Sequence, residues 1–134
     1  MEEKNWLKEF LDQAAEDEIV QNLIKAGSFN QAEKLLKERI TKKEDNEKGY
    51  VLLSAVYFQK GQIGSALKAV SRIIKINPKN YYAHLMLGHI YRGINLEKAR
   101  EHYKKALELD PANKKLLSEL LEASECITRL LGPG

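Results

Sequence analysis

The feature that most constrains the fold of this chain is a spacing of small and large residues that occurs twice, 33 residues apart. Residues 63–78 read IGSALKAVSRIIKINP, and residues 96–111 read LEKAREHYKKALELDP. When the two stretches are aligned, Ala66 matches Ala99. A fixed period of this length is typical of repeat proteins, in which each copy is one supersecondary unit. The repeat therefore predicts an array of similar units.

Each copy has the pattern of a hairpin of two helices. Apolar residues recur every three or four positions, and no long run of alternating β-branched residues is present. Each predicted first helix is followed by a glycine, which can take the left-handed conformation that closes a helix. These glycines are Gly27, Gly61 and Gly93. Side chains that could cap the start of a helix are predicted at Asn46, Asn80 and Asn113.

The hairpin pattern divides most of the chain into three copies, at residues 13–46, 47–80 and 81–113. Pro78 and Pro111 end the second helix of the last two copies, because the residue before a proline is disfavoured in helical conformation. The first copy has no proline there and is the least regular, as a terminal repeat often is.

The residues at the repeated positions resemble the tetratricopeptide repeat family. In the second copy the matching residues are Tyr50, Leu53, Ser54, Tyr57, Gly61, Ala66, Val70, Ile73 and Pro78. In the third copy they are His84, Leu87, Gly88, Tyr91, Ala99, Tyr103, Ala106 and Pro111. The resemblance implies an all-α, right-handed superhelix of three stacked helix-turn-helix hairpins. The third copy lacks one residue in its internal turn, so we expect a tighter turn at Gly93–Asn95.

Helical segments are also predicted on both sides of the repeats. Residues 1–12 form an N-terminal helical extension, residues 114–131 a C-terminal capping helix, and residues 132–134 a short tail. Both segments carry more apolar surface than a simple cap requires, which suggests contacts in a homo-oligomer. The candidate residues for these contacts are Trp6, Phe10, Ile127 and Leu131.

Composition and simple sequence patterns argue against several classes of protein. The net charge of +3 comes from 22 basic and 19 acidic residues, which gives no basic tail for a nucleic acid. The single cysteine, Cys126, cannot form an internal disulfide. The N-terminus does not have the pattern of a signal peptide, and no stretch reaches the roughly 20 apolar residues of a membrane span. A cytoplasmic protein that does not enter a membrane is therefore expected.

No pattern of catalytic, cofactor-binding or metal-binding residues is present in the sequence. His84 and His89 are five residues apart on one predicted helix, so both rings cannot bind the same metal, and His102 lies on another helix. These histidines are interpreted as surface or groove residues. We expect no metal, no cofactor and no enzymatic activity.

The family resemblance implies that one side of each first helix lines a concave groove. Five of the residues at these positions form a predicted apolar patch: Val51, Ala55, Phe58, Tyr82 and Leu85. The rim of this patch is predicted to contain Lys48, Gln59, His89 and Arg92. Exposed apolar patches usually mark binding sites. The alternative is that a terminal helix folds over the patch.

The leading hypothesis for function is therefore an adaptor that binds an amphipathic helix or an extended apolar peptide in this groove. A self-assembling scaffold is the second hypothesis, and an RNA-binding repeat that uses lysines of the second helices is the third. Acidic residues interleave with those lysines, and no aromatic residues are expected among them to stack on bases. One subfamily clamps the C-terminal carboxylate of heat-shock chaperones with a Lys, Asn, Asn, Lys, Arg set. That role is disfavoured, because the matching residues are Asp17, Gln21, Leu52, Tyr82 and Met86.

Overall fold

The computed structural model describes residues 18–42, 46–111, 118 and 121–122 of the chain. All regular structure in these residues is helical. The chain divides into two compact units, Met1–Pro78 and Lys79–Gly134, which are described separately below.

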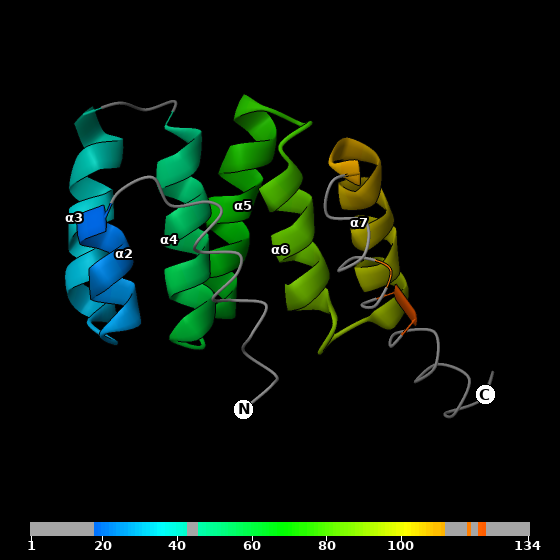
Figure 1. Cartoon of the computed structure of the whole chain (residues 1–134), viewed down its shortest axis with the longest axis horizontal. Coiled ribbons are helices and arrows are strands. Elements are labelled where there is room, and N and C mark those ends of the chain that lie inside the picture. The colour runs from blue at the N-terminus through cyan, green and yellow to red at the C-terminus, as the bar shows by residue number, and fades with distance from the viewer. Residues whose placement is uncertain (1–17, 43–45, 112–117, 119–120, 123–134) are drawn as a thin grey trace. The chain divides into compact units, whose positions relative to one another are not determined.

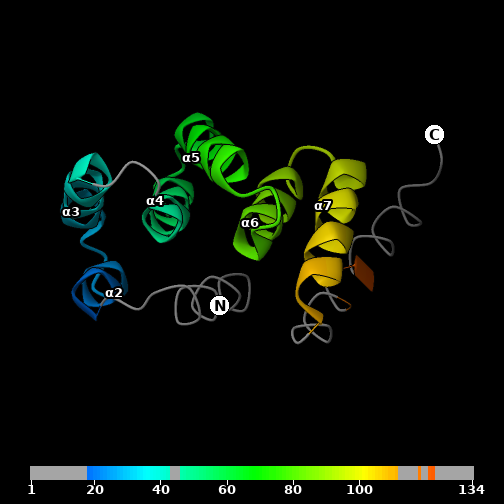
Figure 2. The ribbon, with the colours of Figure 1, turned by 90° about the horizontal axis from the view of Figure 1, so that it is seen from above.

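The first unit contains two helical hairpins (Figure 1). Helices α2 (Glu18–Lys25) and α3 (Phe29–Lys42) form the first hairpin, and α4 (Glu47–Gln59) and α5 (Ile63–Ile76) form the second. The two hairpins pack through α3 and α4. Seen from above, α3 and α4 lie side by side, and α2 and α5 lie beyond them in opposite directions (Figure 2).

The second unit contains one described hairpin, formed by α6 (Tyr81–Tyr91) and α7 (Leu96–Leu109). The prediction of an all-α fold built from repeated hairpins is confirmed. The predicted N-terminal extension at residues 1–12 lies outside the described residues, as does nearly all of the predicted capping helix at residues 114–131.

Asparagine side chains cap the starts of three helices. The Oδ1 of Asn46 accepts a hydrogen bond of 2.8 Å from the amide of Gly49, and the Oδ1 of Asn80 accepts one of 3.1 Å from the amide of Ala83. Each bond satisfies an amide that the first turn of a helix leaves without a backbone partner. Asn95, which the sequence analysis did not select, caps α7 in the same way. The third predicted cap, Asn113, lies outside the described residues.

The first two hairpins turn at glycines in the left-handed region. Gly27 and Gly61 both have a φ of 78°. After α4, the amide of Gln62 donates to the carbonyl of Tyr57 at 2.9 Å, and the amide of Gly61 donates to the carbonyl of Phe58 at 3.0 Å. This pair of bonds is a Schellman motif, which requires a residue with positive φ and therefore favours glycine.

The third hairpin turns differently, and the prediction of a left-handed Gly93 is wrong. Gly93 does not have a positive φ. The amides of Ile94 and Asn95 both donate to the carbonyl of Tyr91, at 2.8 and 2.7 Å. Because α6 ends earlier in its repeat than α4 does, four residues (92–95) separate α6 from α7, against three between the helices of each earlier hairpin. This turn closes onto a single carbonyl without a left-handed residue. The turn at Gly93–Asn95 therefore differs in type from the other two, and the expected tightening is not seen as a shorter connection between the helices.

The two kinds of turn predict responses of different size to a glycine-to-alanine substitution. Gly61→Ala should reduce the free energy of unfolding by about 1–2 kcal/mol, because a Cβ is disfavoured at positive φ. Gly93→Ala should change it by less than about 0.5 kcal/mol, since the space around Gly93 is open. Urea denaturation followed by circular dichroism measures both. Equal losses in the two variants would contradict the difference in turn type.

The core of each hairpin is built from small residues facing large ones. In the first unit Ala66, Val70 and Ile73 of α5 are fully buried. In the second unit Ala99, Tyr103 and Ala106 of α7 are fully buried. Each set has the spacing of one helical face, as the repeated pattern predicts.

Among the described residues, no helix is long and apolar enough to cross a membrane.

Candidate functional site

The predicted groove residues of the first unit fall into exposed and buried groups. Lys48 is exposed, and Phe58 and Gln59 are partly exposed. Val51 and Ala55 are each only 2% exposed. A partner could therefore reach the two ends of this face of α4, but not its middle.

The predicted groove residues of the second unit divide in the same way. Tyr82 and Arg92 are partly exposed, at the start of α6 and just after its end. Leu85 is 2% exposed and His89 is 5% exposed. The aromatic ring of Tyr82 contacts that of Tyr81 edge to face, with 5.1 Å between the ring centroids.

The expectation that Val51, Ala55, Leu85 and His89 line an open surface is therefore not met in this structure. The physical reason is the composition of the two helices. Every residue from 51 to 56 in α4 and from 83 to 90 in α6 is buried. Neither stretch contains an Asp, Glu, Lys or Arg, and a helix without a charged face is typical of buried surroundings. Val51, Ala55, Leu85 and His89 would be exposed on a helix that packs on one side only, but here they are buried.

A buried polar pair lies in the core of the second unit. The hydroxyl of Tyr103 lies 3.1 Å from Nδ1 of His89, and the two rings meet edge to face with centroids 5.5 Å apart. Burial, with a smaller contribution from the positive charge of Arg92, lowers the pKa of His89 to about 3. Burial also raises the pKa of Tyr103 to about 12. Both groups are therefore neutral at pH 7, and the interpretation of His89 as a groove residue is replaced by a core role.

The other two histidines form a ring stack with Tyr91. The ring of His102 lies 5.8 Å from that of His84 and 5.7 Å from that of Tyr91, measured between centroids. His84 is buried and His102 is half-buried. Burial lowers the pKa of His102, and the nearby His84 lowers it further.

Within the described part of the chain, no group of three or more His, Cys, Asp or Glu residues is arranged to hold a metal ion.

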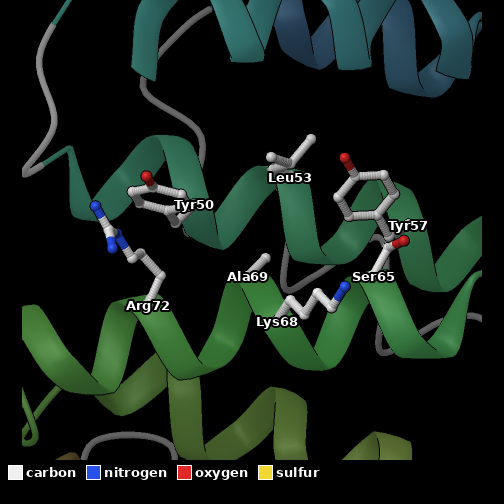
Figure 3. A pocket seen from close by; sticks show the side chains of 7 residues that line it. All are labelled: Tyr50, Leu53, Tyr57, Ser65, Lys68, Ala69 and Arg72. Atoms are coloured by element: carbon white, nitrogen blue, oxygen red, sulfur yellow. The ribbon is translucent and has the colours of Figure 1, made fainter. Parts of the chain in front are cut away.

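A cleft of about 240 Å³ lies between α4 and α5 in the first unit (Figure 3). Its lining residues come from one stripe of each helix: Tyr50, Leu53 and Tyr57 of α4, and Ser65, Lys68, Ala69 and Arg72 of α5. Leu53 and Ala69 are each 5% exposed and make an apolar floor. In Figure 3, Arg72 lies beside Tyr50, and the amino group of Lys68 lies on the side of Ser65 and Tyr57.

A polar cluster on α3 borders this cleft. The Nζ of Lys37 lies 5.8 Å from the ring centroid of Tyr57 and 2.8 Å from Oε2 of Glu33. The Nζ of Lys60 donates to Oε1 of Glu33 at 2.9 Å and to Oδ1 of Asn30 at 2.7 Å. Hydrogen bonds from Lys37 and then Lys60 lower the pKa of Glu33. This cluster connects α3 to the residue that ends α4.

Sequence reasoning missed the cleft, although a signal for it was present. From the sequence alone, Tyr50, Leu53 and Tyr57 are named only as positions of the repeat, and neither Lys68 nor Arg72 is selected as a site residue. Tyr50 and Tyr57 are seven residues apart, so they lie on one side of α4 with hydroxyl groups that a dry core rarely accepts. The four predicted oligomer contacts, Trp6, Phe10, Ile127 and Leu131, lie outside the described residues.

The chain matches established repeat sequences over most of its length. A family model described as a tetratricopeptide repeat matches residues 23–91, and a second model with the same description matches residues 81–113. The chain belongs to the tetratricopeptide repeat family. No curated protein sequence matches it.

Solved structures of other tetratricopeptide repeat proteins have the same fold. One is the first such domain of Spaghetti (RPAP3) bound to the HSP90 peptide SRMEEVD, with 21% identity and a TM-score of 0.71, covering 82% of this chain and 88% of that one. Another is the Yersinia enterocolitica type III secretion chaperone SycD in complex with a peptide of the translocator YopD. It has 20% identity and a TM-score of 0.72, covering 88% of this chain and 94% of that one. At these identities the likeness concerns the fold.

Proposed function

We propose that this chain is a non-enzymatic adaptor that binds a peptide segment of another protein. Its membership of the tetratricopeptide repeat family supports this proposal, and so do the peptide complexes of structurally similar chains. The observation that carries it is the partly exposed ring of Phe58, which lies at a family groove position with Lys48 exposed on the same helix. An apolar ring with a cation on the same helix suits a peptide that presents an apolar side chain and a polar or acidic neighbour.

The proposed contacts are narrower than the sequence alone predicts. In the first unit they are the accessible members of the predicted set, Lys48, Phe58 and Gln59 on α4. In the second unit, taken by itself, the accessible members are Tyr82, on α6, and Arg92, just after α6. We assign the buried members, Val51, Ala55, Leu85 and His89, to packing, because a peptide side chain cannot reach them without displacing core contacts.

The HSP90 peptide is not the expected ligand. Two of the positions that would form a carboxylate clamp are the apolar residues Leu52, 4% exposed, and Met86, fully buried. Neither side chain can donate a hydrogen bond to a carboxylate. The peptide SRMEEVD should therefore show no binding at concentrations at which a clamp domain is saturated.

A charge placed on Phe58 should weaken peptide binding without unfolding the chain. Peptides selected from a phage-displayed library on the wild-type chain should bind Phe58→Glu at least about tenfold more weakly, because a desolvated carboxylate opposes an apolar contact. Fluorescence anisotropy measures the dissociation constants, and thermal melting checks the fold. Ile94→Glu is the matched control, since Ile94 is also a large apolar residue and is 65% exposed in a turn. Equal weakening by both variants, or melting of the Phe58 variant, would remove Phe58 from the contact surface.

A further inference from the structure

The cleft between α4 and α5 joins an apolar floor to a positively charged edge. Leu53 and Ala69 are buried at the floor, whereas the side chains of Lys68 and Arg72 are exposed. The two tyrosines form the α4 side of the opening (Figure 3). A volume of about 240 Å³ is below the range of about 300–1,000 Å³ that is common for small-molecule sites. The cleft is the right size for a single large side chain.

The two cations are placed at a cost to the stability of α5. Lys68 and Arg72 are four residues apart, so their charges are neighbours on one face of the helix, and like charges at this spacing destabilise a helix. Within the part of the chain that the structure describes, neither side chain pairs with a carboxylate. A bound anionic group would relieve this repulsion. Binding of an anionic ligand therefore explains the neighbouring charges of Lys68 and Arg72 better than the stability of α5 does.

We propose that this cleft binds an acidic peptide segment of a partner protein. One aromatic or aliphatic side chain of the peptide enters between Tyr50 and Tyr57 and rests on Leu53 and Ala69. Carboxylates next to it in the peptide pair with Lys68 and Arg72. The site lies on a different side of α4 from Phe58, so it is additional to the adaptor contacts proposed above and does not depend on them.

The surroundings of the cleft favour an acidic peptide over RNA. The aromatic rings beside the cations remove the earlier argument that no ring is available to stack on a base. However, binding of a nucleic-acid backbone needs a run of cations that contacts successive phosphates. The next cation along, Lys37, is already paired with the carboxylate of Glu33 at 2.8 Å. Two available charges around one apolar pocket match a short acidic motif.

The probe for this site is a fluorescein-labelled peptide, GEEFEEG, compared with the neutral peptide GQQFQQG and with a ten-residue uridine RNA. The acidic peptide should bind the full chain, and its affinity should fall with salt because the contact is partly ionic. It should also shift the NMR signals of the Tyr50 and Tyr57 rings. The double variant Lys68→Glu/Arg72→Glu should weaken binding by at least about tenfold, as expected for two weakened ion pairs.

The matched control is Lys104→Glu/Lys105→Glu, which makes the same charge change at two exposed residues of α7. It should bind the acidic peptide within about twofold of the wild type. If the cleft variant does not fold, Lys68→Gln/Arg72→Gln replaces it, and it should also bind the acidic peptide more weakly than the wild type.

Equal binding of the acidic peptide by the cleft and control variants would overturn the proposal. Tighter, cleft-dependent binding of the RNA would also overturn it, because the occupant would then be a nucleic acid. Phe58→Glu should leave this peptide bound, which separates this test from the test of the adaptor surface.

Discussion

Gly88→Ala should reduce the free energy of unfolding by about 1–2 kcal/mol, although alanine normally stabilises a helix interior by up to about 1 kcal/mol relative to glycine. The reason is a close approach between α6 and α7. A Cβ at position 88 would lie 2.5 Å from Cδ1 of Tyr103. The Tyr103 ring is fully buried, so it has little space into which it could move. The cost of overpacking should therefore exceed the gain in helix propensity.

The matched control for this prediction is Gly64→Ala in α5. No atom lies within 4 Å of a Cβ built at Gly64, so this variant should gain about 0.5–1 kcal/mol. Urea denaturation of both variants gives the two free energies. A second test combines Gly88→Ala with Tyr103→Leu, and the double variant should lose less than the sum of the single losses. A stabilised Gly88→Ala variant would show that the helices do not meet at this residue.

Acidification from pH 7 to pH 5 should destabilise the chain by about 2 kcal/mol through His89. The pKa of His89 is lowered to about 3 in the folded chain, whereas an exposed histidine has a pKa of 6.5. Between these two values the unfolded chain binds more protons than the folded chain, so stability rises with pH in this window. The contribution is fully present above pH 6.5 and is lost as the pH falls toward 3. His102 acts in the same direction, because its pKa is also lowered.

The measurement is the free energy of unfolding at half-unit steps from pH 7 to pH 5. This range stays above the ordinary carboxyl pKa of 4.5, and hydrogen bonds from Lys37 and Lys60 lower the pKa of Glu33 below that value, so acidic groups contribute less to the slope than His89 does. His89→Gln removes the titrating group and keeps a polar side chain next to the hydroxyl of Tyr103. We expect this variant to be less stable at pH 7 but to have a shallower pH dependence. An unchanged slope would mean that His89 is accessible to protons in the folded chain.

The repeated spacing predicted the all-α fold and the positions of the small residues correctly, because these depend on local rules. A buried alanine such as Ala66 or Ala99 is required wherever two helices cross closely. The caps at Asn46 and Asn80 depend only on the residues of one turn. The type of the third turn could not be predicted from the presence of Gly93, because one missing residue changes which carbonyl receives the amides.

The candidate site was harder to predict, since exposure depends on the whole arrangement of helices. The family positions placed Leu85 and His89 on an open wall, but every residue of α6 from Ala83 to Ile90 is buried. The absence of any Asp, Glu, Lys or Arg from Ala83 to Ile90 could have signalled this burial. Predicting the cleft would have required the rotation of α4 relative to α5, which brings Tyr50 and Arg72 to the same opening. A sequence pattern assigns each residue to a face of its own helix and does not fix this rotation.

The contact of Lys60 with α3 strengthens the coupling between the folding of the first two hairpins, which also pack through α3 and α4. Lys60 immediately precedes Gly61, and its amino group binds Asn30 and Glu33 of the preceding hairpin. In stacked repeats the cooperativity of unfolding depends on the interfaces between neighbours. Lys60 reaches α3 from the turn that Gly61 closes, so opening that turn also weakens the interface. The left-handed glycine thus contributes to the cooperativity of the first unit as well as to the geometry of its own hairpin.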